Sequence, residues 1–95
     1  MKKMEISNGE SIYGPYLICS KGQYHLGINL KSSNDEKVDF KITANKGEIV
    51  LQSLQLKSGE NRIDFELERD YKDIEFIIIS GYEQVVQLFD IGFVG

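Results

Sequence analysis

Every second residue is apolar in three segments of this chain, which span residues 24–30, 38–42 and 63–67. Successive side chains of a β-strand point to opposite faces, so this period of two predicts strands that bury one face. Residues 74–80 are apolar at almost every position after Glu75 and predict a central strand covered on both faces. We expect the core to contain Tyr24, Leu26, Ile28, Leu30, Val38, Phe40, Ile42, Ile63, Phe65, Leu67, Ile74, Phe76 and Ile78.

Four further segments have the composition of strands. Residues 4–7 predict a first edge strand, residues 16–19 a short apolar strand, and residues 85–94 an almost fully apolar last strand. In residues 49–56 the apolar positions change parity partway along the segment. That change predicts a β-bulge near residues 52–53.

Glycine-containing turns are expected at residues 8–9 and 20–22, because glycine and asparagine tolerate positive φ. The residues around the second turn predict a β-hairpin. Gly14-Pro15 favours an extended entry, since proline disfavours the helical region for the residue before it. Residues 16–19 then form the first arm of the hairpin and residues 22–30 the second.

Seven or eight short strands, joined by turns rich in Gly, Asn and Ser and without a helical period, predict an all-β fold. We expect an antiparallel β-sandwich of jelly-roll type, in which the last strand pairs near the first. A chain of 95 residues supports one core, so residues 1–95 are predicted to form a single domain, on its own or as a module of a longer protein.

Composition excludes several classes of function. The net charge is −4 and the basic residues are scattered, whereas nucleic-acid binding needs clustered cations. No apolar run approaches the roughly 20 residues of a spanning helix, which predicts no membrane partner. Met1-Lys2-Lys3 is followed by Glu5 and not by the apolar stretch of an export signal, so the chain as given is predicted to be cytoplasmic.

Cys19 and His25 have side chains that could take part in catalysis, but a structural role explains each of them better. Cys19 is the only cysteine and lies in an apolar strand, which predicts a reduced and buried thiol. His25 occupies a polar position of its strand with no nucleophile in its sequence context. We expect it to form a surface or cross-strand hydrogen bond and predict that the protein is not an enzyme.

The chain resembles small jelly-roll domains of the carbohydrate-binding-module type. The resemblance rests on the motif at residues 13–16, the Lys-Gly-Gln-Tyr opening at 21–24, the strands at 63–65 and 74–76, and the closing residues 88–91. More narrowly, it is similar to accessory domains found beside bacterial glycosyltransferases and other surface-polysaccharide proteins. It implies a glycan or polysaccharide ligand, and a glycosyltransferase domain as a further partner.

In that family, aromatic rings stack on sugar rings while polar side chains bind the hydroxyls. This chain has no tryptophan, so the resemblance assigns stacking to tyrosines at loops or strand ends. The two loops that pair a tyrosine with backbone freedom, residues 13–16 and 81–84, are candidates for one shared edge. The expected ligand-binding residues are Tyr13, Tyr16, Tyr82, Gln84, Gln87 and Asn29.

Many relatives of this type carry a structural calcium near the first and last strands. The resemblance places Glu5 and Asp90 there, and the alternative is that both are edge charges that discourage aggregation. No other cofactor is expected. The alternative function is a structural or protein-docking accessory domain that positions a partner enzyme of polysaccharide synthesis, with an exposed apolar patch near Ile77, Ile79 and Phe93.

Overall fold

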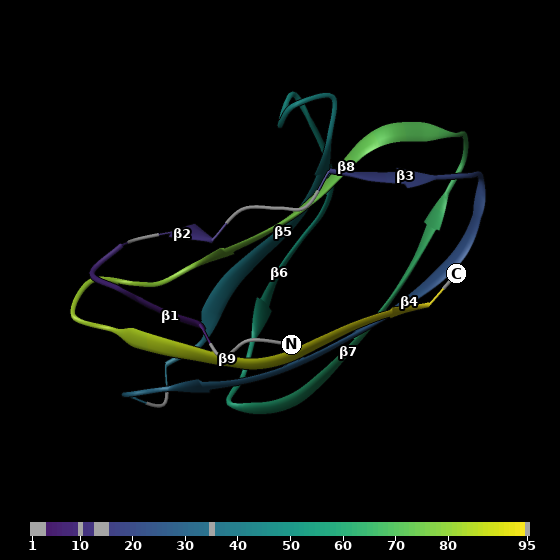
Figure 1. The fold of residues 1–95 in the computed structure, drawn as a ribbon. Helices are drawn as coiled ribbons and strands as arrows, with labels where there is room; N and C mark the ends of the chain where they lie inside the picture. The colour runs from purple at the N-terminus through teal and green to yellow at the C-terminus, as the bar shows by residue number, and fades with distance from the viewer. Residues whose placement is uncertain (1–3, 10, 13–15, 35, 95) are drawn as a thin grey trace.

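The computed structural model describes residues 4–9, 11–12, 16–34 and 36–94, which form two β-sheets packed face to face (Figure 1). One sheet, here called the β4 sheet, has the strand order β1-β9-β4-β7; the other, the β8 sheet, has the order β2-β8-β5-β6, with β3 also paired to β8. The strands are β1 Met4–Ser7, β2 Ser11–Ile12, β3 Leu17–Cys19, β4 Gly22–Ser32, β5 Val38–Ala44, β6 Ile49–Leu56, β7 Gly59–Leu67, β8 Tyr71–Ile79 and β9 Val85–Val94.

This arrangement confirms the predicted antiparallel β-sandwich with jelly-roll closure. The last strand, β9, pairs antiparallel with the first, β1, which forms an edge of the β4 sheet. Strand β8 is central, because β5 pairs with one of its sides and β2 and β3 pair with the other. The short strand β2 is one more than the sequence predicted. Among the described residues, no helix is long and apolar enough to span a membrane.

The predicted hairpin between residues 16–19 and 22–30 is wrong. β3 pairs with β8, whereas β4 pairs with β7 and β9, so the turn between them crosses from one sheet to the other. Side-chain contacts hold this crossing: the Tyr24 hydroxyl donates to the Ser20 carbonyl at 2.6 Å, and the Lys21 amide donates to Asp70 Oδ1 at 2.8 Å. The local pattern specified two strands and a turn, but not the sheet to which each strand belongs.

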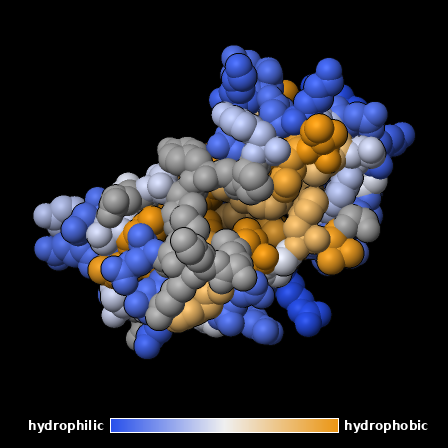
Figure 2. Space-filling model, in the orientation of Figure 1, coloured by the Kyte–Doolittle hydropathy of each residue, from blue (hydrophilic) through white to orange (hydrophobic). Residues whose placement is uncertain are grey.

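The space between the sheets holds the predicted core, and Figure 2 shows hydrophobic side chains gathered there with hydrophilic ones around them. Every predicted core residue is buried except Tyr24, which is partly buried against the cluster. The ring of Tyr24 stacks on Phe93 at 5.2 Å and on Phe65 at 5.6 Å between centroids. Cys19 is buried as predicted, and desolvation raises the pKa of its thiol.

The predicted bulge is also present. The pairing of β5 with β6 shifts between Ile42, which opposes Gln52, and Thr43, which opposes Val50. This leaves Leu51 without an opposite residue on β5, one position from the predicted site. The shift matters for the outer face of the β8 sheet, because it fixes which β6 residue lies next to Thr43.

Candidate functional site

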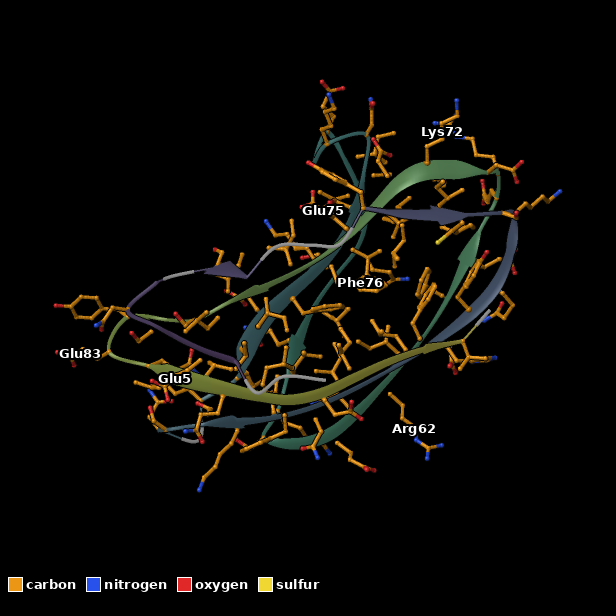
Figure 3. The ribbon with its side chains drawn as sticks, in the orientation of Figure 1. Glu5, Arg62, Lys72, Glu75, Phe76 and Glu83 are labelled. Atoms are coloured by element: carbon orange, nitrogen blue, oxygen red, sulfur yellow. The ribbon has the colours of Figure 1, made fainter. Side chains whose placement is uncertain are left out.

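The outer face of the β8 sheet contains an unusual group of buried polar side chains. Because Ile74, Phe76 and Ile78 of β8 face the core, the alternation of a strand directs Glu75 and Ile77 to the outer face. Figure 3 shows Glu75 and Phe76 on opposite sides of β8. Glu75 is only 9% exposed, so most of its side chain is covered on this face, but its carboxylate oxygens are not among the buried unpartnered atoms of the described residues.

Thr43 of β5 lies directly opposite Glu75 in the β5–β8 pairing. It is 2% exposed, and its Oγ1 atom has no hydrogen-bond partner among the described residues. Within the described part of the chain, no hydrogen bond or ion pair engages the Glu75 side chain either. Buried polar groups are normally hydrogen-bonded, so the unsatisfied hydroxyl of Thr43 is an exception among the described residues.

Tyr16 occupies the next position across the sheet from Glu75. It precedes Leu17, which pairs with Ile74, so antiparallel register places Tyr16 beside Glu75. Leu17 packs against the core, and alternation therefore directs Tyr16 to the outer face, where it is 61% exposed. Figure 3 accordingly shows Glu75 close to the start of β3.

Glu75, Thr43 and Val50 form one line across β8, β5 and β6, and Tyr16 lies just before β3 at the β8 end of this line; we call these four residues the β8-sheet row. With strands about 4.8 Å apart, the row spans roughly 15 Å. It offers an exposed aromatic ring and a carboxylate that accepts hydrogen bonds, whereas the Thr43 hydroxyl is enclosed by the protein. This combination suits a ligand with an apolar ring face and several hydroxyl or amino groups. Sequence reasoning found Tyr16 but missed Thr43 and Glu75, because each looks like an ordinary strand residue.

Tyr16 and Tyr82 lie apart along β8. Leu17 pairs with Ile74, whereas Tyr82 follows the end of β8 at Ile79. Five residues of strand, about 16 Å, therefore separate the two places along β8. Figure 1 shows β3 and the β8–β9 connection at opposite sides of the view. Tyr82 is 83% exposed and isolated from the row, and the predicted ligand residue Tyr13 lies outside the described residues.

Gln84 is not a surface residue, which corrects the expectation that it binds a ligand. It is 1% exposed, and its Nε2 donates to Ser32 Oγ at 2.8 Å and to the Glu36 carbonyl at 3.1 Å. Its Oε1 accepts from the Gly81 amide at 2.6 Å. The side chain therefore ties the β8–β9 connection to the segment after β4, and its hydrogen-bonding groups are already used.

Gln87 and Glu5 lie opposite each other on β9 and β1, and Gln87 Nε2 donates to Glu5 Oε2 at 3.2 Å. Asp90 lies farther along β9, opposite Asn29. Three residues of strand, roughly 10 Å, separate it from the Glu5–Gln87 pair. In the described ranges no three His, Cys, Asp or Glu side chains cluster. Glu5 and Asp90 do not form the compact oxygen set that calcium requires, and calcium binding remains a prediction.

Asn29 and Asp90 border a shallow groove on the outer face of the β4 sheet, where Gly27 lies opposite Gly92. The groove has a volume of about 180 Å³ and is also lined by Arg62. Neither glycine has a positive φ, and a Cβ atom at either would meet nothing within 4 Å. The glycines leave open space on this face, and Arg62 points away from the sandwich beside it (Figure 3).

His25 forms the cross-strand contact that the sequence predicted. Its Nδ1 lies 2.6 Å from Oδ1 of Asp64, the residue opposite it on β7. Both side chains are more than half exposed, and the pair lies on the β4 sheet, away from the β8-sheet row. It therefore brings no acid–base chemistry to that row.

The expected apolar docking patch is absent from the described residues. Ile77 is only 8% exposed, and Ile79 is half-buried. The Phe93 ring lies between those of Tyr24 and Phe76, with centroid distances of 5.2 and 5.4 Å. Its apolar surface is used in the core, so these three residues do not form one exposed surface.

Comparison with known proteins identifies the fold. No protein-family model matches the chain, and no curated protein matches its sequence. Solved structures do match, and those that resemble it include carbohydrate-binding modules. The chain therefore has the jelly-roll sandwich fold that such modules have.

One similar structure is a CBM4 module, with a TM-score of 0.73, 11% identity and coverage of 97% of this chain and 81% of that one. Another is the C-terminal domain of EclA, described as a sugar-binding protein, with a TM-score of 0.57, 12% identity and coverage of 98% and 77%. A third is the C-terminal CBM6 of LamC from Zobellia galactanivorans, with a TM-score of 0.55, 18% identity and coverage of 87% and 75%. At these identities the likeness concerns the fold.

Proposed function

We propose that this chain is a non-catalytic carbohydrate-binding module that holds a glycan on the β8-sheet row. The observation that carries the proposal is the exposed ring of Tyr16 just before β3, near Glu75 of β8, whose carboxylate has no partner among the described residues. A ligand that supplies hydroxyl groups donates hydrogen bonds to this carboxylate.

Each residue has a defined role in this proposal. Tyr16 stacks on the apolar face of a sugar ring, while the Glu75 carboxylate accepts hydrogen bonds from its hydroxyls. One ring and a few hydrogen bonds support only weak affinity, with a Kd of about 10⁻⁴ to 10⁻³ M. The fold, and its likeness to carbohydrate-binding and sugar-binding proteins, support the assignment.

Titration calorimetry with a panel of neutral oligosaccharides, including cellohexaose, xylotriose and β-1,4-galactotriose, tests the proposal. Glu75→Ala is the decisive variant, because it removes the carboxylate acceptor. We expect it to weaken glycan binding by about 5- to 30-fold, as for one lost hydrogen bond. Glu66→Ala is the control, because it removes an exposed carboxylate on β7 of the other sheet, and it should bind normally.

Binding that is equal in Glu75→Ala and the unaltered protein would contradict the role of the row. Tyr16→Ala should abolish measurable binding of the same glycan, because it removes the stacking surface. Tyr82→Ala distinguishes this row from the loop expected from sequence. If it abolished binding while Tyr16→Ala did not, the glycan site would lie at the β8–β9 connection.

The second candidate function is a docking domain that positions a partner enzyme, such as a glycosyltransferase of polysaccharide synthesis. The observation that favours it is the side chain of Ile18, which is 84% exposed at the edge strand β3 next to Tyr16. Exposed apolar residues at an edge suit a protein contact. This function predicts no response to the glycan panel, together with stable co-elution with the partner that Ile18→Lys abolishes.

A further inference from the structure

Strand β6 forms an edge of the β8 sheet, because among the described residues it pairs with β5 alone. Its eight residues, Ile49–Leu56, include no charged residue and no proline. A free edge presents backbone N–H and C=O groups that pair readily with another strand. We infer that β6 pairs antiparallel with β6 of a second copy of this chain, so that the two β8 sheets join into one continuous sheet.

The other edge strands of the described chain are protected against such pairing. The edge strand β7 carries charged side chains at alternate positions, Glu60, Arg62, Asp64 and Glu66. The edge strands β1, β2 and β3 have only 4, 2 and 3 residues. Charge and shortness are two of the features by which proteins keep sheet edges from pairing. β6 has neither, and a long uncharged edge invites aggregation unless a specific partner covers it.

The two faces of β6 follow from its pairing with β5. Leu54 lies opposite Phe40 of the core and therefore faces inward. Gln52 lies opposite Ile42 and faces inward as well, so Ser53 between them faces outward. A two-fold axis perpendicular to the sheet keeps the outer faces of both copies on one side, and a residue at the axis lies opposite itself. With Ser53 at the axis, Gln52 of each copy lies opposite Leu54 of the other, and both face inward.

The same register brings opposite charges together at both ends of β6. The bulged Leu51 has no opposite residue, as in the pairing with β5, and Val50 then lies opposite Gln55 of the second copy. Two positions farther, just beyond the strand, Glu48 lies opposite Lys57 of the second copy. The two-fold symmetry gives this pair twice. Opposite charges on facing residues stabilise paired strands, and like charges destabilise them, so this register is favoured over its neighbours.

Both charged side chains are available for this contact. Glu48 and Lys57 are exposed, and within the described part of the chain neither forms an ion pair. Glu48 Oε2 accepts a hydrogen bond from Asn45 Nδ2 at 2.8 Å, and a carboxylate has further acceptor sites for a cation. A cleft of about 510 Å³ beside β6 is lined in part by Leu54 and Ile63. The inward side chains of the second copy's β6 are expected to cover this apolar lining.

Pairing of β6 with itself produces a dimer and not a fibre. Each copy contributes the same edge, so the contact uses both free edges and leaves none for a third copy. A contact along a single strand is at the small end of protein interfaces, so we expect a dissociation constant of about 10⁻⁵ to 10⁻⁴ M.

Sedimentation velocity at protein concentrations from about 1 μM to about 1 mM measures this equilibrium. Ser53→Lys is the decisive variant, because it places two ammonium groups opposite each other at the axis while the side chain stays on the outer face. We expect it to raise the dissociation constant of the dimer about tenfold. Gln23→Lys is the matched control, since it adds the same charge at an exposed position of β4, an inner strand of the other sheet, and should leave the dimer unchanged.

A charge exchange tests the register. Glu48→Lys and Lys57→Glu should each raise the dissociation constant by about fivefold, because each places like charges opposite one another. The variant with both substitutions should return to within about twofold of the unaltered protein, because it restores opposite charges across the dimer. Damage to the turn before β6 would not be repaired in this way. Thermal unfolding verifies that each variant is folded.

A chain that stays monomeric at every concentration would overturn the inference, also where the β6 edge takes a strand from another protein. Assembly that continues beyond the dimer would overturn it too. So would a dimer that persists in Ser53→Lys, or one that the double charge exchange fails to restore. A dimer that weakens in Ser53→Lys, persists in Gln23→Lys and returns in the double variant would support the inference. None of these outcomes depends on the proposed glycan site.

Discussion

At the scale of single residues, the polar side chains of this protein divide by whether the fold has already satisfied them. Gln84 is fully satisfied, with bonds from Nε2 to Ser32 and the Glu36 carbonyl and a bond at Oε1 from the Gly81 amide. Thr43 is equally buried and has none among the described residues. In the low dielectric of the protein interior, the hydrogen bonds of Gln84 are stronger than in water, and the unpartnered hydroxyl of Thr43 is more costly. We therefore expect opposite effects when each residue is made apolar.

Gln84→Ala should destabilise the fold by about 2 to 4 kcal/mol, because it leaves the Gly81 amide and the acceptors around Nε2 without partners. Denaturation in urea measures the free energy of unfolding. Gln87→Ala, at a half-exposed position, is the control and should cost less than about 0.5 kcal/mol. If Gln84→Ala lowered the free energy of unfolding no more than the control does, the hydrogen bonds of the buried Gln84 amide would not contribute to stability.

Thr43→Val should instead raise the free energy of unfolding by about 1 kcal/mol, since it replaces an unsatisfied hydroxyl with a methyl group. Differential scanning calorimetry measures this effect. A destabilised variant would mean that the Thr43 hydroxyl has a partner in the folded protein.

At the scale of elements, the alternation of apolar and polar residues predicted from sequence is found in the strands of the structure. Strand β4 keeps its alternation along residues 24–30, with apolar positions inward and Gly27 outward. Gly27 lies beside Gly92 of β9, and neither packing nor backbone conformation requires a glycine at either place. A glycine within a strand weakens it unless something else uses the space.

Gly27→Ala should therefore stabilise the protein by about 0.5 to 1 kcal/mol, because alanine loses less conformational freedom on folding. Gly59 provides the contrasting control, since its φ of 105° is one that side-chain-bearing residues rarely adopt. Gly59→Ala should be destabilising for that reason. Chemical denaturation of the two variants compares them, and a destabilised Gly27→Ala would show that the strand needs glycine there for its own geometry.

The positions of the strands could be predicted from the local sequence, but the pairing between strands could not. Bulge, turn and strand positions follow from the sequence because they depend on parity and on residues that tolerate positive φ. The pairing of β3 with β8 does not, because strand pairing is decided by contacts between distant segments. A two-strand pattern separated by a short turn is equally compatible with a hairpin and with a crossing between sheets. Only the completed sandwich distinguishes the two.

At the scale of the whole molecule, stability depends on one core shared by both sheets. Ile28 is 1% exposed and lies on β4, between β7 and β9. Ile28→Ala should cost about 2 to 5 kcal/mol through lost burial and the cavity left behind. Ile18→Ala is the control, because Ile18 is 84% exposed and should cost less than about 0.5 kcal/mol. Thermal or urea unfolding measures both, and equal losses would contradict the assignment of the two faces.

Local sequence was enough to specify the class of fold and the core of this protein. Alternation is a local property, so residues 24–30, 38–42 and 63–67 could be assigned an inner face before their partners were known. It also named Tyr16 as a candidate ligand-binding residue, and the ring of Tyr16 is exposed in the structure, and it predicted a surface or cross-strand hydrogen bond for His25. Each of these depends on a residue and its near neighbours alone.

Pairing between distant strands determined where those side chains meet. Tyr16, Thr43 and Glu75 come from separate parts of the chain and become neighbours only because β3 and β5 pair with β8. Likewise the Gln84 side chain can be buried because Ser32 Oγ and the Glu36 carbonyl, which follow from the β4 end, accept hydrogen bonds from its Nε2. Hydrogen bonding of a buried polar group depends on partners distant in sequence, and a pattern of apolar and polar residues contains no information about them.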